Sequence, residues 1–354
     1  MRAIWPLVSL FSAVKALPAA SSTASASVAA SSSPAPTASA TGNPFEGYQL
    51  YVNPYYKSQV ESSAIPSLSA SSLVAQASAA ADVPSFYWLD TANKVPTMGE
   101  YLGDIQTQNA AGASPPIAGI FVVYDLPDRD CAALASNGEY SISDGGVEKY
   151  KAYIDSIREQ IVTYSDVQTI LIIGHAGWLG WPANIGPAAQ LYASVYKNAS
   201  SPAAVRGLAT NVANFNAWSI DSCPSYTSGN DVCDEKSYIN AFAPELSSAG
   251  FDAHFITDTG RNGKQPTGQS AWGDWCNVKD TGFGAQPTTD TGDELADAFV
   301  WVKPGGESDG TSDTSSARYD AHCGYSDALQ PAPEAGTWFQ AYFEQLLTNA
   351  NPSL

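Results

Sequence analysis

The chain is short of positive charge and of long hydrophobic runs. Its 354 residues include 16 Lys and Arg against 35 Asp and Glu, which gives a net charge of -19. Because this charge would repel nucleic acid, no nucleic-acid partner is expected, whereas a neutral polymer would not be repelled. The apolar run Ala3–Val14 is shorter than the roughly 18 residues of a membrane span, and no other run is longer, so no membrane anchor is expected. Zinc-ligand spacing and cofactor motifs are also lacking, so we expect no metal and no cofactor.

The N-terminal residues have the composition of an export signal followed by a linker. Met1-Arg2 precedes the apolar run and small residues follow it, so residues 1–20 are predicted to be a signal peptide. Residues 21–42 are almost wholly Ser, Ala, Thr and Pro, which lack the apolar surface needed to fold and predict a linker. Residues 43–354 then form one large domain. We expect a secreted, extracellular glycoprotein, because Asn198-Ala-Ser200 is a glycosylation acceptor.

Strand patterns alternate with helical patterns through most of this domain, which predicts an α/β fold of β/α units around a parallel sheet. The clearest helix has apolar residues three and four apart, at Val147, Tyr150, Ile154, Ile157 and Ile161. After Gly260 the chain is rich in Gly, Pro, Thr and Asp, which predicts long loops. The expected strands are Ser85–Leu89, Ile117–Val123, Thr169–Ile173, Leu208–Val212, His254–Ile256 and Phe299–Val302.

Charged and aromatic residues follow one of these strands directly. The segment Tyr124-Asp-Leu-Pro-Asp-Arg-Asp130 lies where parallel α/β folds place their chemistry, although a solvated turn could have the same composition. Further motifs follow it: His175-Ala-Gly-Trp-Leu-Gly-Trp-Pro182, Gly207-Leu-Ala-Thr-Asn-Val-Ala-Asn214, Gly263-Lys-Gln-Pro-Thr-Gly268, Trp272-Gly-Asp-Trp-Cys276 and Val302-Lys-Pro-Gly-Gly-Glu307-Ser-Asp309. In this order they resemble glycoside hydrolase family 6, the fungal cellobiohydrolases and endoglucanases, from Asn43 to the C-terminus. The resemblance implies a distorted β/α barrel with fewer than eight strands.

The resemblance also implies roles for particular residues. An inverting glycosidase needs a carboxylic acid that protonates the leaving oxygen and a carboxylate that activates water. Asp130 matches the aspartate that raises the pKa of the acid, and Asp309 matches the residue proposed as the base. Tyr124 and Arg129 match residues beside the scissile bond. Positions that bind sugar or order the site match Trp88, Asp90, Ser136, His175, Trp178, Trp181, Asn214, Trp275, Lys303 and Glu307.

Several of these residues also have an ordinary structural interpretation. Lys303 and Glu307 could form a surface ion pair, and His175 could be a structural histidine. The two tryptophans of Trp178-Leu-Gly-Trp181 lie in a Gly- and Pro-containing loop that is unsuited to a core, and an indole face packs well against a pyranose ring. Trp218 and Trp338 are expected in the core.

Five cysteines leave one thiol without a partner in an exported chain. The resemblance implies a Cys276–Cys323 disulfide, and closing that loop stabilises the fold by about 4 kcal/mol. Cys223 and Cys233 are close enough in sequence to close a local loop. Cys131 resembles a cysteine whose family partner lies in a stretch that this chain lacks.

A β/α unit is predicted to be missing between Ile173 and Gly174. In the family, the strand matched by Thr169–Ile173 leads into a segment that holds the general acid. Here Gly174-His175 follows at once, a motif that in the family comes after the next strand. Parallel neighbours need a crossover of a dozen or more residues, so we expect a gap in the sheet. Asp128 or Asp130 is not expected to replace the acid, which must lie within hydrogen-bond reach of the glycosidic oxygen.

The sequence therefore indicates a monomeric cellulase type of enzyme that acts on cellulose or cello-oligosaccharides. Its activity is hydrolysis of β-1,4-glucosidic bonds with inversion, impaired by loss of the acid. Two alternatives stay open. The chain could be a non-catalytic secreted glucan-binding protein, or an isoform or gene-model product that does not reach a native fold. The choice between exo- and endo-action depends on the loops after Gly260.

Overall fold

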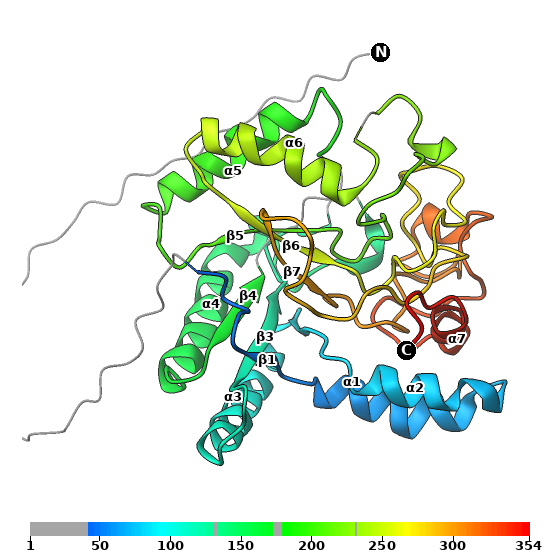
Figure 1. Cartoon of the computed structure of the whole chain (residues 1–354), viewed down its shortest axis with the longest axis horizontal. Coiled ribbons are helices and arrows are strands. Elements are labelled where there is room, and N and C mark those ends of the chain that lie inside the picture. The colour runs from blue at the N-terminus through cyan, green and yellow to red at the C-terminus, as the bar shows by residue number, and fades with distance from the viewer. Residues whose placement is uncertain (1–41, 131–132, 173–178, 231) are drawn as a thin grey trace, which may run out of the picture. The chain divides into compact units, whose positions relative to one another are not determined.

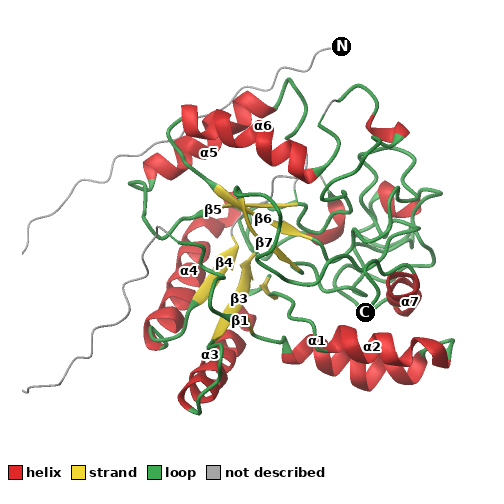
Figure 2. Ribbon diagram, viewed as in Figure 1, coloured by secondary structure: helices red, strands yellow, loops and turns green. Residues whose placement is uncertain are grey.

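Parallel strands form the centre of the structure, with helices outside them (Figures 1 and 2). The computed structural model describes residues 42–130, 133–172, 179–230 and 232–354. In one sheet β3 pairs with β1, β2 and β4, and in the other β6 lies between β5 and β7. The strands are β1 (Gln49–Leu50), β2 (Tyr87–Leu89), β3 (Ile117–Val123), β4 (Thr169–Ile172), β5 (Gly207–Thr210), β6 (His254–Asp258) and β7 (Ala296–Val300).

A single parallel bridge joins the two sheets. Ser85 pairs with Trp301, and the Phe86 amide donates to the Trp301 carbonyl at 3.0 Å. The strands therefore follow one another as β4, β3, β2, β7, β6 and β5. Among the described residues, β4 pairs with β3 alone and β5 with β6 alone, so this barrel is distorted and open between β4 and β5.

The helices cover the outside of the barrel and one end of it. The α-helices are α1 (Pro54–Gln59), α2 (Val74–Ala81), α3 (Val95–Ala110), α4 (Gly146–Thr163), α5 (Ile185–Asn198), α6 (Glu235–Ser248) and α7 (Gln340–Thr348). Shorter turns are the π-helix Val60–Ala64 and the 3₁₀ helices Ile65–Ser67, Ser71–Leu73, Ala92–Lys94, Leu134–Ser136, Ile142–Asp144, Ser225–Thr227 and Ala321–Gly324. None of the described helices is long and apolar enough to cross a bilayer.

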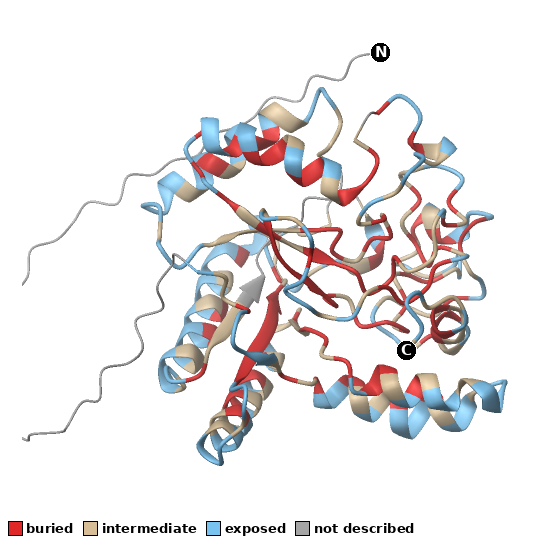
Figure 3. Cartoon of the chain, viewed as in Figure 1, coloured by how far each residue is buried: buried red, intermediate tan, exposed pale blue. Residues whose placement is uncertain are grey.

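Alternation along β3 divides the core into an inner and an outer layer. Ile120 and Val122 point into the barrel, where they join side chains of the other sheet such as Val300. Phe121 and Val123 point outward and pack under α3 and α4. All seven residues of β3 are buried, as its continuous apolar sequence predicts for a strand covered on both faces (Figure 3).

The predicted strands and the predicted helix are present, but only Ile117–Val123 has the predicted strand limits, and the others differ by one to three residues at an end. The last strand runs from Ala296 to Val300 rather than from Phe299 to Val302. The predicted helix is α4, but its buried residues include Tyr153, and Val147 is exposed. Figure 2 shows that the chain after β6 consists mostly of loops, as its composition predicts.

Candidate functional site

The loop after β3 places a tyrosine, an arginine and an aspartate together at the carboxyl end of the barrel. The Tyr124 hydroxyl donates to Asp130 Oδ2 at 2.5 Å, and the Arg129 guanidinium lies 4.3 Å from the centre of the Tyr124 ring. Arg129 also donates to the Ser136 carbonyl at 3.2 Å and to the Asp90 carbonyl at 3.1 Å. Asp130 has φ 54°, a left-handed conformation that is uncommon outside glycine and that concentrates at functional sites.

Burial shifts the titration of this cluster. It raises the pKa of Asp130, although the Tyr124 hydroxyl and the Arg129 charge act in the opposite direction. Burial also raises the pKa of Asp125 to about 6, against the Glu139 amide and Arg129. The strand end therefore holds two carboxyl groups that retain their protons to a higher pH than exposed aspartates do.

Asp309 lies in a different environment, paired with a buried arginine. Arg261 Nη1 donates to both carboxylate oxygens of Asp309, at 2.9 and 2.8 Å, and the two side chains are 1% and 7% exposed. The Asn277 amide donates to the same carboxylate at 2.9 Å. These hydrogen bonds fix the orientation of the Asp309 carboxylate at the carboxyl end of the barrel.

The loops that carry Ser136 and Asp309 touch one another. A Cβ added to Gly310 would lie 2.9 Å from the Ala135 Cβ and 2.6 Å from Cys323 Sγ, so only glycine fits there. The Leu134 amide donates to Asp320 Oδ2 at 3.1 Å, next to that disulfide. The loop after β3 is thus fixed against the loop after β7.

Four of the predicted sugar-binding residues form a second cluster. Lys303 lies 5.7 Å from the Trp88 ring centre and 3.5 Å from the Glu307 carboxylate. Trp88 packs edge-on against Tyr124 at 5.0 Å and donates its indole N–H to the Val302 carbonyl. Asp90 pairs with Lys94 at 2.6 Å, and Lys94 and Glu307 attract one another electrostatically. The structure thus brings Trp88, Lys303 and Glu307 beside Tyr124.

Two of the tryptophan side chains from different loops are in contact. Trp181 lies 5.5 Å from Trp272, whose N–H donates to Asn216 Oδ1 at 2.8 Å. Trp275 instead lies 5.6 Å from the His322 ring. Asn214 is buried and accepts from the Phe215 amide, so its side chain organises the loop itself. Trp218 and Trp338, expected in the core, are partly buried and pack against its margins.

Asp258, at the end of β6, was missed by the sequence analysis. Its carboxylate accepts four backbone amides: Ala213 and Gly260 at 3.1 and 2.9 Å, and Val302 and Lys303 at 3.1 Å each. It therefore ties together the loops that follow β5, β6 and β7. An aspartate directly after a strand was the available signal, because that is where parallel sheets place functional loops.

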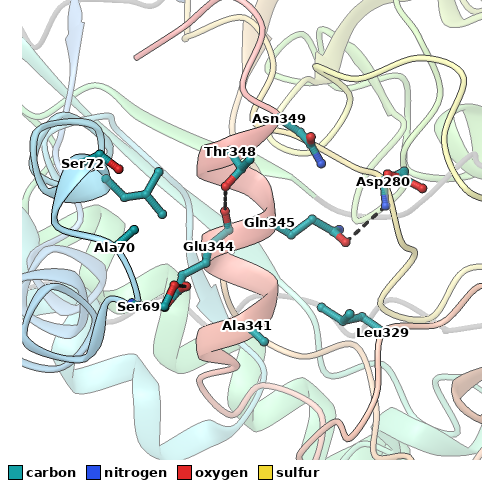
Figure 4. Close-up of a pocket in the computed structure, with 11 residues that line it drawn as sticks. Ser69, Ala70, Ser72, Asp280, Leu329, Ala341, Glu344, Gln345, Thr348 and Asn349 are labelled. Carbon is teal, nitrogen blue, oxygen red and sulfur yellow. Dashed lines mark hydrogen bonds between the residues drawn. The ribbon is translucent and has the colours of Figure 1, made fainter.

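Several predictions fall outside the described part of the chain: the roles of Cys131, His175 and Trp178, the junction between Ile173 and Gly174, and the signal peptide with nearly all of the linker, residues 1–41. Within the described residues, no group of three His, Cys, Asp or Glu side chains is arranged to hold a metal ion. A shallow surface hollow lies away from these clusters, between α7 and residues 69–73 (Figure 4). Its lining includes Glu344 and Gln345 but none of the predicted site residues.

The structure contains two disulfides. Cys276–Cys323 joins residues 47 apart, as the resemblance implies, and Cys223–Cys233 closes a loop of 10.

Replacing Cys276 and Cys323 together by Ala is expected to lower the free energy of unfolding by about 4 kcal/mol, because the longer loop is released in the unfolded chain. Replacing Cys223 and Cys233 should cost about 3 kcal/mol. Urea denaturation measures both values, and an equal or reversed order would contradict the loop-length argument.

The buried carboxyl group of Glu235 should make the stability of the fold depend on pH. It lies at the start of α6, is 4% exposed, and accepts from Asn216 at 2.9 Å. Burial raises its pKa to about 7, although hydrogen bonds from Asn216 and Thr210 oppose the shift. A raised carboxyl pKa stabilises the fold fully below the ordinary value, and this stabilisation is lost as the pH rises through about 7.

Glu235→Gln should therefore remove this pH dependence. Compared with the parent chain, the variant is expected to gain about 1–3 kcal/mol in unfolding free energy between pH 4.5 and pH 8. Urea denaturation at several pH values measures the difference. Glu245→Gln, an exposed position on the same helix, serves as the control and should follow the parent. Parallel curves for Glu235→Gln and the parent would refute the prediction.

A parallel barrel with carboxylates and indole rings at the carboxyl ends of its strands is the arrangement expected of a glycoside hydrolase. The profile of Glycosyl hydrolases family 6 matches residues 45–173 and 173–350. The chain therefore belongs to glycosyl hydrolase family 6, and the predicted α/β barrel and cellulase class are confirmed.

Individual relatives agree with this assignment. The chain is 71% identical over 363 residues to a probable 1,4-beta-D-glucan cellobiohydrolase C of Aspergillus niger, covering 89% of this chain and 79% of the relative. It is 69% identical over 363 residues to the corresponding protein of Emericella nidulans, covering 89% and 80%. The solved catalytic core of the cellobiohydrolase Cel6A from Chaetomium thermophilum is 59% identical with a TM-score of 0.87, covering 88% of this chain and 99% of that core.

Proposed function

We propose that this chain binds cellulose or cello-oligosaccharides and hydrolyses their β-1,4-glucosidic bonds with inversion at a strongly reduced rate. The reduction follows from a missing β/α unit between Ile173 and Gly174 that would carry the general acid. The observation that carries this proposal is that, within the described residues, β4 and β5 are not paired with one another or with any strand between them. The Humicola insolens Cel6A structure, 54% identical to this chain, is described as a complex with glucose and cellotetraose, which supports the substrate class.

The comparisons support the missing unit in two ways. The family profile matches in two pieces that meet at residue 173. The alignment with the Aspergillus niger relative is 363 residues long, longer than this whole chain, although it uses only 89% of the chain. The relative therefore contributes residues within that span that have no counterpart here.

The described carboxyl groups at the site are already engaged. Both carboxylate oxygens of Asp309, the residue proposed as the base, accept from Arg261. Asp130 has the raised pKa of an acid, but its Oδ2 accepts the Tyr124 hydroxyl. The Asp258 carboxylate is used by four amides. None of these three is free to protonate a glycosidic oxygen without breaking such contacts.

A glucan-binding role without turnover is the second candidate. The clusters around Trp88 and Trp181 offer ring faces for sugar binding, and such binding does not depend on a general acid. In either case we propose a monomeric, exported protein. Residues 1–20 would be removed as a signal peptide, and residues 21–42 would remain as a linker. Asn198 is exposed at the end of α5, as a glycosylation site requires.

Turnover and binding assays separate these possibilities. With cellotetraose or barley β-glucan as substrate, the purified chain should be slower than the Aspergillus niger relative by about 10²–10⁴-fold, the usual contribution of an acid or base. Equal rates would refute the proposal. Retention on cellulose with a cooperative melt and no turnover would select the binding role, and no cooperative melt would select a non-native product. Sequencing the transcript across Ile173 and Gly174 shows whether coding sequence was lost.

A further inference from the structure

The strands on either side of the barrel opening have free edges. Within the described ranges, β4 has a hydrogen-bonded partner only on its β3 side and β5 only on its β6 side. Three of the four residues of β5 are half-buried, whereas β3 and β7 are buried throughout. A strand edge presents a row of unpaired N–H and C=O groups that can pair with another strand.

Helix α4 has an apolar flank that faces away from its neighbour. On one side, Gln160 and Tyr164 lie against Gly99 and Gly103 of α3. Val162 is two residues from both, which places it about 200° round the helix, on the opposite side. It is 65% exposed, and Ile161 beside it is only partly buried.

Helix α5, on the other side of the opening, has a similar flank. Its Tyr192 ring packs against Phe242 of α6, and its Tyr196 ring stacks on Phe251 at 4.2 Å. Leu191 and Val195 each precede one of these tyrosines, about 100° round the helix, and each is 60% exposed. Figure 1 shows α4 and α5 on the side of the barrel where β4 and β5 lie.

We propose that the opening between β4 and β5 is a docking site for a strand–helix unit supplied by a separate polypeptide. The strand would add in parallel between β4 and β5, and the apolar face of the helix would cover Val162, Leu191 and Val195. Peptides recognise free sheet edges in this way, with main-chain hydrogen bonds for affinity and side-chain contacts for specificity.

The occupant is the corresponding unit of a related chain. The Aspergillus niger relative carries extra residues within the aligned span, and the two profile matches meet at the end of β4. A β/α crossover is the element that joins parallel strands in this fold. A second copy of this chain is not the proposed occupant, because it has the same opening. The inference rests on the missing unit of the proposed function.

Titration with a synthetic peptide tests the site. The peptide has the sequence of the Aspergillus niger segment that falls between the partners of Ile173 and Gly174, carries a fluorescent label, and is added to the full chain. We expect saturable one-to-one binding and a higher melting temperature. Val162→Asp and Leu191→Asp should each weaken binding at least about 10-fold, because each removes the burial of a large apolar side chain. Val74→Asp, at an exposed valine of α2, should leave it unchanged.

Each contrary outcome has a distinct meaning. Equal binding of a scrambled peptide, or no binding to a chain that melts cooperatively, overturns the inference. Self-association of the chain that Val162→Asp abolishes would also overturn it, by making a second copy the occupant. A peptide with its aspartates changed to Asn should bind without restoring turnover. Family-like turnover by the chain alone would refute the proposed function instead, whatever the peptide does.

Discussion

Inserting the Aspergillus niger segment between Ile173 and Gly174 is expected to raise the hydrolysis of cellotetraose by about 10²–10⁴-fold, the usual contribution of a general acid. In the proposed mechanism the base is Asp309, whose carboxylate accepts from Arg261. It also holds Asp130 with a raised pKa beside Tyr124. The proposed mechanism then lacks only a proton donor over the leaving oxygen, which the inserted segment is expected to carry.

Stability should increase in the same experiment. The insert gives β4 and β5 a shared neighbour, and each buried amide that gains a partner avoids a cost of roughly 1–3 kcal/mol. An insert whose aspartates are all changed to Asn separates the two effects, since it should restore the melting temperature but not the rate. If the unmodified insert restores stability and leaves the rate unchanged, the acid is not the missing component. Initial rates and thermal melts on the three chains make this comparison.

From the sequence, the presence of the strands that carry the site was predicted more accurately than the residues at which those strands begin and end. β3 was predicted without error because all seven of its residues are apolar and buried. The predicted position of β7 was wrong because Asp297 interrupts the apolar pattern of this strand. That carboxylate is buried in a pair with Arg206, with N–O distances of 2.9 and 3.1 Å, and lies 3.1 Å from His254. A charge is accepted within a strand when it is paired, and the partner lies 91 residues away in the sequence.

Site residues that form a local pattern in the sequence were predicted, whereas residues whose role depends on distant partners were not. Tyr124, Arg129 and Asp130 are close in sequence, so a strand followed by polar residues was enough to find them. Asp258 had a local signal, its position after a predicted strand, but its hydrogen-bond partners and those of Glu235 come from other loops and no local pattern shows them. A gap in the sheet was expected after β4, and among the described residues β4 and β5 are not paired, although α5 provides a crossover between them.

Removing Arg261 is expected to cost more stability than any other single change considered. Its guanidinium is 1% exposed, packs 4.4 Å from the Phe215 ring centre and binds both oxygens of Asp309. Arg261→Met keeps a side chain of similar length but leaves the Asp309 carboxylate buried without its partner. Breaking a buried pair in this way costs about 3–5 kcal/mol. Urea denaturation of the variant measures the loss.

A second pair and a double variant complete the test. Arg318 pairs with Glu334 at 3.0 Å, but both side chains are about 40% exposed. Arg318→Met should therefore cost less than about 1 kcal/mol. Adding Asp309→Leu to Arg261→Met should recover most of the lost stability, because the cost lies in the unpaired charge rather than in the absent bond. Similar losses at Arg261 and Arg318, or no recovery in the double variant, would show that the buried Asp309 charge does not dominate. Turnover should stay low in the double variant whatever its stability, since Asp309 is the proposed base.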